Sequence, residues 1–368
     1  MIGKTMSLYL AGTLLRNTIG IFTLFFSLIL VVDIVEFSRS VSSITDVGFG
    51  EIFNVVLLRA PSFAENVLPF CVMFGASVSL IVLNKRLELA VARASGVSVW
   101  QFLLPLGITA AFLGVFTAMV YNPLALSGQV LSSANEAKIL VRGEKPTDTG
   151  SRGSWMRLNQ KDGDLVLRAQ IEQDAGIELT KVIIYRFDAK GEMVERIDAS
   201  TASFVESLSQ GNHYELTDLV SLRPGDKSQT KAKAILPVEI SRSELQANQT
   251  TVNNVSFWDL KEHAARIQLA GKNPLPYLTR HQAHLALPLL FIAMVLLAST
   301  VSLRFARFGV NGKAILAGVL AGFVLYVLSK LLVTFGSNGL VPPFVAAWSA
   351  AIVASLIGIT VLLHQEDG

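Results

Sequence analysis

The residues best suited to chemistry are ionisable side chains at the ends of apolar runs. Asp33, Glu36 and Arg39 recur at intervals of three, so on a helix they lie near one face. Lys330 stands alone in another apolar run. A charged side chain costs about 2.5–3.5 kcal/mol at the centre of a bilayer and less near its surface. These positions therefore predict either ion pairing among the first three residues and snorkelling of Lys330, or contacts to anionic lipid headgroups.

A second candidate site is the segment 84–96, which reads NKRLELAVARASG. It is rich in helix formers and ends in Gly96, a residue type that suits the position just after a helix. Ser98 and Gln101 have the spacing of a capping box that opens the following helix. An apolar stripe with one flanking carboxylate is formed by Leu87, Val91, Ala94 and Glu88. The segment is therefore predicted to be a short helix that either rests on lipid headgroups or docks into a soluble partner.

Other motifs indicate no catalytic centre. His281 and His284 are three residues apart, but no H-E-x-x-H motif and no nearby cysteine accompanies them, so we expect histidines at the mouth of a span and no metal site. The chain has no G-x-x-x-x-G-K-[ST] motif, so it does not bind ATP through a P-loop. We expect no catalytic residue and no cofactor.

The elements that position these residues are membrane spans. The chain has 368 residues, 51% of them hydrophobic and 16% charged, with a mean hydropathy of +0.51. This composition is typical of membrane proteins, and a net charge of +3 is too small to indicate nucleic-acid binding. Runs of about 20 apolar residues predict membrane-spanning helices. The six candidates are about Asn17–Phe37, Pro61–Leu83, Val99–Tyr121, Leu285–Leu303, Ala314–Phe335 and Val341–Leu363.

A polar block divides the spans into two groups of three. Residues 122–276 hold 19 of the 31 Lys and Arg residues and 20 of the 28 Asp and Glu residues. Within the block Ile183, Tyr185 and Phe187 alternate with other residues, as on one face of a strand, and turn signals recur at short intervals. We expect a six-helix membrane protein with an inserted all-β domain, an antiparallel sandwich or jelly roll, over 122–276. A connecting helix is predicted at about 256–270, and the flanking membrane parts are 1–121 and 277–368.

Lysine and arginine are unevenly distributed between the two sets of helix ends. One set carries Lys4, Arg16, Lys85, Arg86, Arg93, Arg304, Arg307 and Lys313. The opposite short loops carry only Arg39 and Arg59. Because basic residues favour the cytoplasmic side, both termini are predicted to be cytoplasmic and the β-domain to lie outside the cytoplasm.

The segment 88–96 (ELAVARASG) resembles the coupling-helix motif of the lipopolysaccharide export permeases, the LptF/LptG family. Supporting similarities are found at 183–187, 322–328 and 339–343. The layout of three helices, a β-domain and three helices is also similar, so the resemblance covers nearly the whole chain and favours the LptG type. It implies an inner-membrane half-permease that pairs with an LptF-like subunit and an LptB-like ATPase dimer. Lipopolysaccharide would pass through the periplasmic jelly roll to an LptC/LptA-like bridge.

The resemblance also assigns roles to residues of this chain. It implies that the residues that couple the chain to the ATPase are Glu88, Arg86, Leu87, Val91, Ala94, Ser95 and Gly96. The family uses basic residues around its outer rim to meet lipid phosphates, which implies headgroup contacts for Arg39, Lys330 and Arg59. Asp33 departs from the LptG-like pattern, which tends to be more basic there. An alternative function remains open: a scaffold or sensor that transports nothing, displays the β-domain and docks a partner through the 84–96 helix.

Overall fold

The structure is a computed structural model of the whole chain. It describes residues 3–42, 44, 47–142, 154–160, 163–173, 178–188, 192–206, 212–222, 228–238, 252–269, 272–302 and 312–367. The chain divides into two compact units, and each is described by itself. The helical unit contains Met1–Gly143, Asn254–Ala264 and Asn273–Gly368, and the β-unit contains Glu144–Asn253 and Ala265–Lys272.

The first part of the helical unit differs from the expected spans in two places. The helices are α1 (Lys4–Ser40), α2 (Phe49–Glu65), α3 (Leu68–Lys85), α4 (Glu88–Ala94), α5 (Val99–Phe116), the π-helix η1 (Thr117–Tyr121) and α6 (Asn122–Arg142). The span expected at Pro61–Leu83 is broken after α2, at Asn66 and Val67. The third span does not end at Tyr121, because α5, η1 and α6 follow one another without interruption. Residues 122–142, expected to begin the β-domain, are therefore helical.

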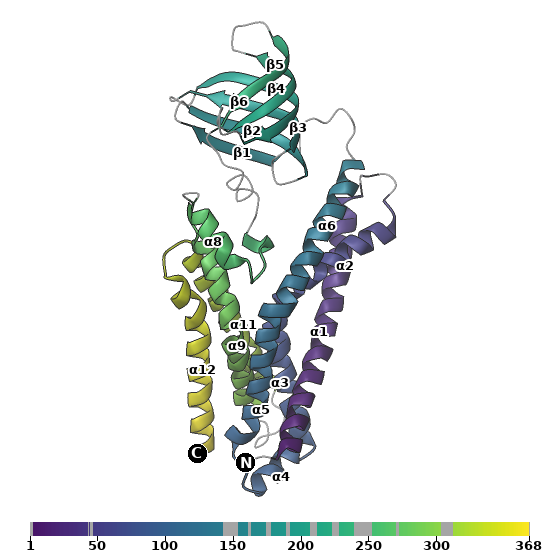
Figure 1. Cartoon of the computed structure of the whole chain (residues 1–368). Coiled ribbons are helices and arrows are strands. Elements are labelled where there is room, and N and C mark those ends of the chain that lie inside the picture. The colour runs from purple at the N-terminus through teal and green to yellow at the C-terminus, as the bar shows by residue number, and fades with distance from the viewer. Residues whose placement is uncertain are drawn as a thin grey trace. The chain divides into compact units, whose positions relative to one another are not determined.

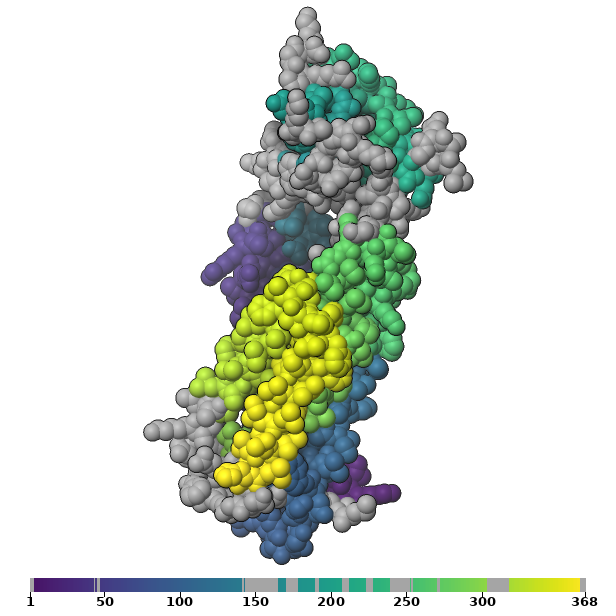
Figure 2. All heavy atoms as spheres, turned by 90° about the vertical axis from the view of Figure 1, so that its left-hand side faces the viewer, coloured from purple at the N-terminus to yellow at the C-terminus, as the bar shows by residue number. Residues whose placement is uncertain are grey.

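The second part of the helical unit contains α9 (Leu275–Ser302), α11 (Gly312–Ser337), α12 (Pro343–Asp367) and the first half of α8 (Leu260–Leu269), whose residues from Ala265 on belong to the β-unit. The connecting helix predicted at about 256–270 corresponds to α8. Among the described residues six helices are long and apolar enough to cross a membrane, as expected. Helix α12, which faces the viewer in Figure 2, has many exposed apolar side chains, among them Val345, Ile352, Val353, Leu356 and Ile357. Exposing so many apolar side chains to water would be unfavourable. Such a face is therefore typical of contact with lipid or with a second membrane helix.

Helix α9 is the centre of the helical unit and packs against α3, α5, α11 and α12. Close approach between helices depends on glycine at several positions, and Gly114 and Gly75 are two examples. A Cβ added to Gly114 of α5 would lie 2.5 Å from the Cα of Pro288 in α9, and one added to Gly75 of α3 would collide with Oγ1 of Thr18 in α1. Small residues let membrane helices come close enough for extensive van der Waals contact.

The β-unit contains an antiparallel sheet whose six described strands pair in chain order (Figure 1). The strands are β1 (Ser154–Gln160), β2 (Gly163–Gln173), β3 (Glu178–Phe187), β4 (Met193–Val205), β5 (His213–Leu222) and β6 (Gln229–Pro237). This arrangement is compatible with the expected jelly roll, although the described strands form one sheet. The core of the sheet is built from buried side chains of β2 to β6, with Ile184, Tyr214 and Leu216 almost completely inaccessible.

The alternation predicted for β3 is present, with the buried face on the other set of residues. Val182 and Ile184 are buried, whereas Ile183, Tyr185 and Phe187 share the half-buried face. Lys181 has φ +49°, and the pairing of β3 with both neighbours skips a residue close to it. This irregularity places Leu179 on the same buried face as Val182, which a strict period of two does not predict.

Candidate functional site

The short helix α4 lies at the end of the helical unit where both chain termini are found (Figure 1). Its underside is buried: Leu89 and Ala92 are 3% and 7% exposed, and Leu89 packs in one cluster with Leu10 of α1 and Phe102 of α5. Arg93 adds a cation–π contact, with its Cζ atom 6.0 Å from the centre of the Phe102 ring. The helix is therefore fixed to α1, α3 and α5, so that a force applied to it reaches several spans.

The predicted helix at about 84–96 contains α4 but begins four residues too early. Helix α3 ends at Lys85, and α4 begins only at Glu88 because Leu87 takes the left-handed conformation, with φ +61°. The C-terminal side follows the prediction: Gly96 has φ +85°. The capping box is also confirmed, since the Gln101 N–H donates to Ser98 Oγ while the Ser98 N–H donates to Gln101 Oε1, both at 3.3 Å.

The predicted apolar stripe forms the free surface of α4. Leu87 and Val91 are 65% and 67% exposed, and Ala94 and Ser95 are exposed beside them. A leucine in a left-handed conformation costs about 1–2 kcal/mol relative to glycine, so this exposed side chain is kept at a cost to the fold. Its position favours a role at the surface.

Glu88 lies at the first turn of α4 and is held from two sides. The Tyr9 hydroxyl of α1 donates a hydrogen bond to Glu88 Oε1 at 3.2 Å, and Nη1 of Arg86 lies 3.9 Å from the same oxygen. Its side chain is 35% exposed and that of Arg86 is 59% exposed, so both can meet a partner. The tie to Tyr9 was not expected from the sequence, because nothing in the spacing connects α1 to this carboxylate.

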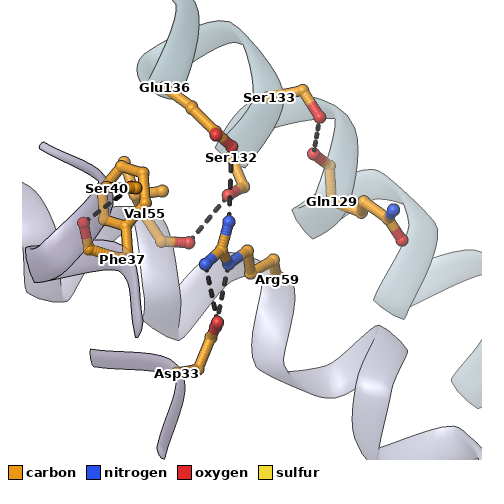
Figure 3. A network of polar contacts seen from close by, with 9 residues as sticks. All are labelled: Asp33, Phe37, Ser40, Val55, Arg59, Gln129, Ser132, Ser133 and Glu136. Carbon is orange, nitrogen blue, oxygen red and sulfur yellow. Dashed lines mark hydrogen bonds and ion pairs between the residues drawn. The ribbon is translucent and has the colours of Figure 1, made fainter. Parts of the chain in front are cut away.

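At the opposite end of the helical unit, Arg59 of α2 is the centre of an ion-pair network (Figure 3). Its Nε donates to Asp33 Oδ2 at 2.8 Å and its Nη2 donates to Oδ1 at 2.6 Å. Nη1 lies 3.4 Å from Glu136 Oε2 of α6, and the guanidinium carbon lies 4.9 Å from the centre of the Phe37 ring. One arginine thus joins α1, α2 and α6.

This network corrects the expected pairing of Asp33, Glu36 and Arg39. Asp33 is paired with Arg59, a residue from another helix, because the α1 face that carries Asp33 is turned towards α2. Arg39 is exposed and makes no ion pair with any described residue. Of the three predicted headgroup contacts, Arg39 is therefore open to solvent or lipid, whereas the guanidinium of Arg59 is already engaged.

Lys330 of α11 lies near a second polar group of residues. Its Nζ donates to Asn66 Oδ1 at 3.0 Å, at the break between α2 and α3, and lies 5.5 Å from the centre of the Tyr326 ring. Nearby, Glu65 Oε1 is 3.7 Å from His284 Nδ1. His281 stacks on Phe257, with ring centres 5.3 Å apart. Lys330 therefore has a protein partner, although its own span contains no acidic residue.

Glu136 and Glu65 are site residues that the sequence analysis missed. Glu136 was placed in the β-domain, although residues 129–142 contain no Gly or Pro and many helix formers, a signal for continued helix. Glu65 is an ionisable residue within an apolar run. Such residues usually pair with another polar group, and this signal could have marked Glu65 as a site residue.

The comparisons with known proteins identify the family. The model of the family "Lipopolysaccharide export system permease LptF/LptG" matches residues 8–364. The chain belongs to this family. It is 25% identical over 319 residues to the lipopolysaccharide export system permease protein LptG of Escherichia coli strain K12, which covers 84% of each chain. The protein of the same name from Haemophilus influenzae is 22% identical over 368 residues, covering 98% of this chain and 97% of the relative.

Membership in the LptF/LptG family agrees with the architecture. The family match extends from α1 to α12 and so includes both sets of spans and the inserted sheet. The family is one of permeases, and the six apolar helices fit a multi-pass inner-membrane protein. The relatives carry the name LptG, as the sequence resemblance favoured.

Proposed function

We propose that this chain is the LptG-like permease subunit of an ATP-driven lipopolysaccharide exporter. It pairs with an LptF-like subunit, is driven by an LptB-like ATPase dimer, and passes lipopolysaccharide from the inner membrane to an LptC/LptA-like periplasmic bridge. Family membership and the names of the relatives support the substrate. The chain itself contributes no catalytic residue and no cofactor, so the hydrolysing subunit must touch one of its surfaces.

The observation that carries the proposal is the construction of α4. A helix whose underside is packed against three spans and whose upper side presents Leu87, Val91 and the Glu88 carboxylate has the form of an element that receives a force. A helix resting passively on lipid would need a wide apolar face directed at the membrane. Here the buried side chains of α4 contact protein, and its remaining apolar side chains are few.

The proposed orientation places α4 and both termini in the cytoplasm. The distribution of Lys and Arg supports it, because the α4 end of the helical unit carries most of the basic residues found outside the polar block. The chain continues into the β-unit after the C-terminal end of α6. That end of the helical unit is then periplasmic. The ion-pair network around Arg59 lies at that same periplasmic end.

Headgroup contact is proposed for Arg39 and Lys330, and in a lesser role for Arg59. Arg39 is exposed and can meet a phosphate directly. Lys330 would exchange its neutral partner Asn66 for a charged one, which gives a stronger hydrogen bond. Arg59 would have to leave Asp33 first, so its main contribution is to hold α1 in place. Photocrosslinkers at positions 39 and 330 test this: crosslinks to lipopolysaccharide that vanish on removal of its phosphates support the contacts, and absence of lipid crosslinks beside well-crosslinked neighbours rejects them.

The decisive experiment joins affinity purification to a transport assay. Wild-type chain should recover an ATPase, and the complex in proteoliposomes should release lipopolysaccharide to an acceptor only with ATP. Glu88→Lys should abolish recovery or uncouple the complex, since loss of one partner of an interfacial charge pair costs about 2–5 kcal/mol. Glu215→Lys makes the same charge change on an exposed position of β5 and serves as the control. Normal complex recovery and transport by Glu88→Lys contradict coupling through α4, and failure of the wild type to recover any ATPase favours the scaffold function.

A further inference from the structure

One buried carboxamide joins three separate segments of the helical unit. Asn122, the first residue of α6, has no exposed surface. Its Nδ2 donates to both carboxylate oxygens of Glu65 in α2, at 3.1 and 3.0 Å, and its Oδ1 accepts a hydrogen bond from the backbone N–H of Phe257 at 3.1 Å. The amide nitrogen is thus shared between the two oxygens of one carboxylate, and the amide oxygen accepts a hydrogen bond from a different segment. A buried amide that is hydrogen-bonded on both sides fixes the relative position of its partners more narrowly than apolar packing does.

The segment that Asn122 holds is the one by which the chain returns from the β-unit. Residues 255–259 follow the 3₁₀ turn η2 (Val252–Asn254) and precede α8. The Phe257 ring is buried, stacks on His281 and meets His284 edge-on, with the second pair of ring centres 6.1 Å apart. The next residue, Trp258, is 61% exposed, and its Nε1 donates to the carbonyl of Met119 at 3.1 Å. The segment is therefore attached by two hydrogen bonds to η1 and α6 and by its ring to α9.

The attachment lies where two irregularities of the helices coincide. Helix α2 ends at Glu65 and α3 begins at Leu68, so the second crossing is broken beside this hydrogen bond. Met119 lies in η1, and π-helical turns are rare and frequent at functional sites. The Tyr121 hydroxyl of η1 donates to the Pro61 carbonyl at 2.9 Å, which ties η1 to the last turns of α2 before the break. Breaks of this kind let helices change direction, whereas continuous helices move as rigid rods.

We infer that Asn122 is a positioning residue of a joint, formed with Glu65, Met119, Phe257 and Trp258, that transmits movements of α2 and α6 to the segment leading back from the β-unit. The inference rests on the proposed function and deepens it. In a transport cycle α4 receives the stroke, the spans rearrange, and the joint makes the returning segment follow them. Without the joint, ATP hydrolysis continues but delivery of lipid to the β-unit is lost.

The contact itself is tested without transport. Hydrogen–deuterium exchange of the full complex should show the peptide covering 255–259 exchanging about tenfold faster in Asn122→Ala, the factor that corresponds to loss of about 1.4 kcal/mol. Trp258→Phe, which keeps an aromatic ring but removes the indole N–H, should have the same effect to a smaller degree. Asn135→Ala is the matched control, because Asn135 also bonds from α6 to α2, with Nδ2 3.2 Å from Asn54 Oδ1, but is remote from the returning segment. Unchanged exchange in both Asn122→Ala and Trp258→Phe overturns the joint.

The role in transport is tested by comparing two rates. For Asn122→Ala in proteoliposomes we expect ATP hydrolysis close to that of the wild type and lipopolysaccharide released to an LptA-like acceptor per ATP reduced by about tenfold. A purely structural role would lower both rates together, and that outcome overturns the inference. The exchanged pair Glu65→Gln with Asn122→Asp restores an amide–carboxylate contact and keeps an acceptor for the Phe257 N–H, so it should rescue release. If the wild type itself moves no lipopolysaccharide, the proposed function fails while the exchange result still decides the contact. If the wild type transports and Asn122→Ala releases as much per ATP, only the joint fails.

Discussion

Replacing Asp33 by alanine should destabilise the helical unit more than any other single change at the Arg59 end. The side chains of Arg59 and Asp33 are only 17% and 11% exposed, and they share two hydrogen bonds of 2.8 and 2.6 Å. Without Asp33 the guanidinium keeps Glu136 as its ion-pair partner, at 3.4 Å. The substitution therefore leaves the largely buried Arg59 cation with only one, more distant carboxylate, and it removes the ion pair between α1 and α2.

The magnitude follows from the burial of the pair. Removing one partner of a fully buried ion pair costs about 3–5 kcal/mol. Glu136 remains and both side chains keep some solvent access, so we expect about 3 kcal/mol, the lower end of that range. Replacing both partners by apolar residues, Asp33→Leu with Arg59→Met, removes the unpaired charge as well. The double variant should lose about 1 kcal/mol or less, because well-packed apolar pairs often replace buried ion pairs without loss.

The assay is an unfolding titration of the complex in bilayer-like discs, with exposed Glu36→Ala, one turn from Asp33, as the control for charge removal on α1. We expect Asp33→Ala to shift the midpoint strongly, the double variant weakly and the control very little. The reasoning is refuted if Asp33→Ala is as stable as the wild type, or if the double variant is as unstable as the single one. The double variant also separates two roles of Arg59: restored stability with lost lipid crosslinking at position 39 would assign Arg59 to the headgroup directly.

Three further predictions concern α4 and the orientation. Leu87→Gly should leave thermal stability unchanged or raise it by up to about 1 kcal/mol, because it relieves a left-handed leucine, yet reduce ATPase recovery; full recovery would contradict a docking role for this side chain. Tyr9→Phe should preserve the complex but lower lipid released per ATP, since it frees Glu88 from α1; an unchanged ratio would show that this hydrogen bond does not matter. Cysteine introduced at Ser203 should react with an impermeant reagent in intact spheroplasts, and cysteine at Ser95 only after permeabilisation; equal labelling of the two would reverse the orientation.

The sequence predicts the spans well where a single physical requirement dominates. A single apolar run that crosses a bilayer satisfies its backbone hydrogen bonds as a helix, so α1, α5, α9, α11 and α12 were foreseen, with ends that differ by up to 13 residues. The capping box before α5 was also predictable, because its two hydrogen bonds involve residues only three positions apart.

Other features depend on tertiary contacts that no local pattern encodes. The break at Asn66 and Val67 follows no glycine and comes five residues after Pro61, which itself lies inside α2. Residues 122–142 were assigned to the β-domain because their polarity was averaged with that of the block, yet they form α6. The buried face of β3 depends on the irregularity at Lys181, where the pairing with β2 shifts register, and composition alone does not place such a shift.

The candidate site shows the same division. The surface of α4 could be predicted, since its residues are neighbours in the chain and the resemblance to a family marked them. The partners of the charges could not be predicted: Asp33 had one local candidate of opposite charge, Arg39, and the structure pairs it with Arg59, 26 residues away. A low-dielectric surrounding makes such distant pairs decisive, because an unpaired charge there costs far more than at a water-exposed surface.

The two ends of the helical unit differ in the polar links that they add to their apolar cores, and this difference suits the proposed cycle. Around α4 the packing is mainly apolar, from Leu10, Leu89 and Phe102, so the end that receives a stroke is stiff. At the opposite end an apolar cluster also joins α1, α2 and α6, and buried ionic and hydrogen-bonded links through Arg59 and Asn122 are added to it. A cation released from such a link can be compensated by a contact to an anionic lipid, whereas an apolar side chain cannot. Exchange of polar links over an intact apolar cluster would let one movement of α4 release lipid at the other end without separating the spans.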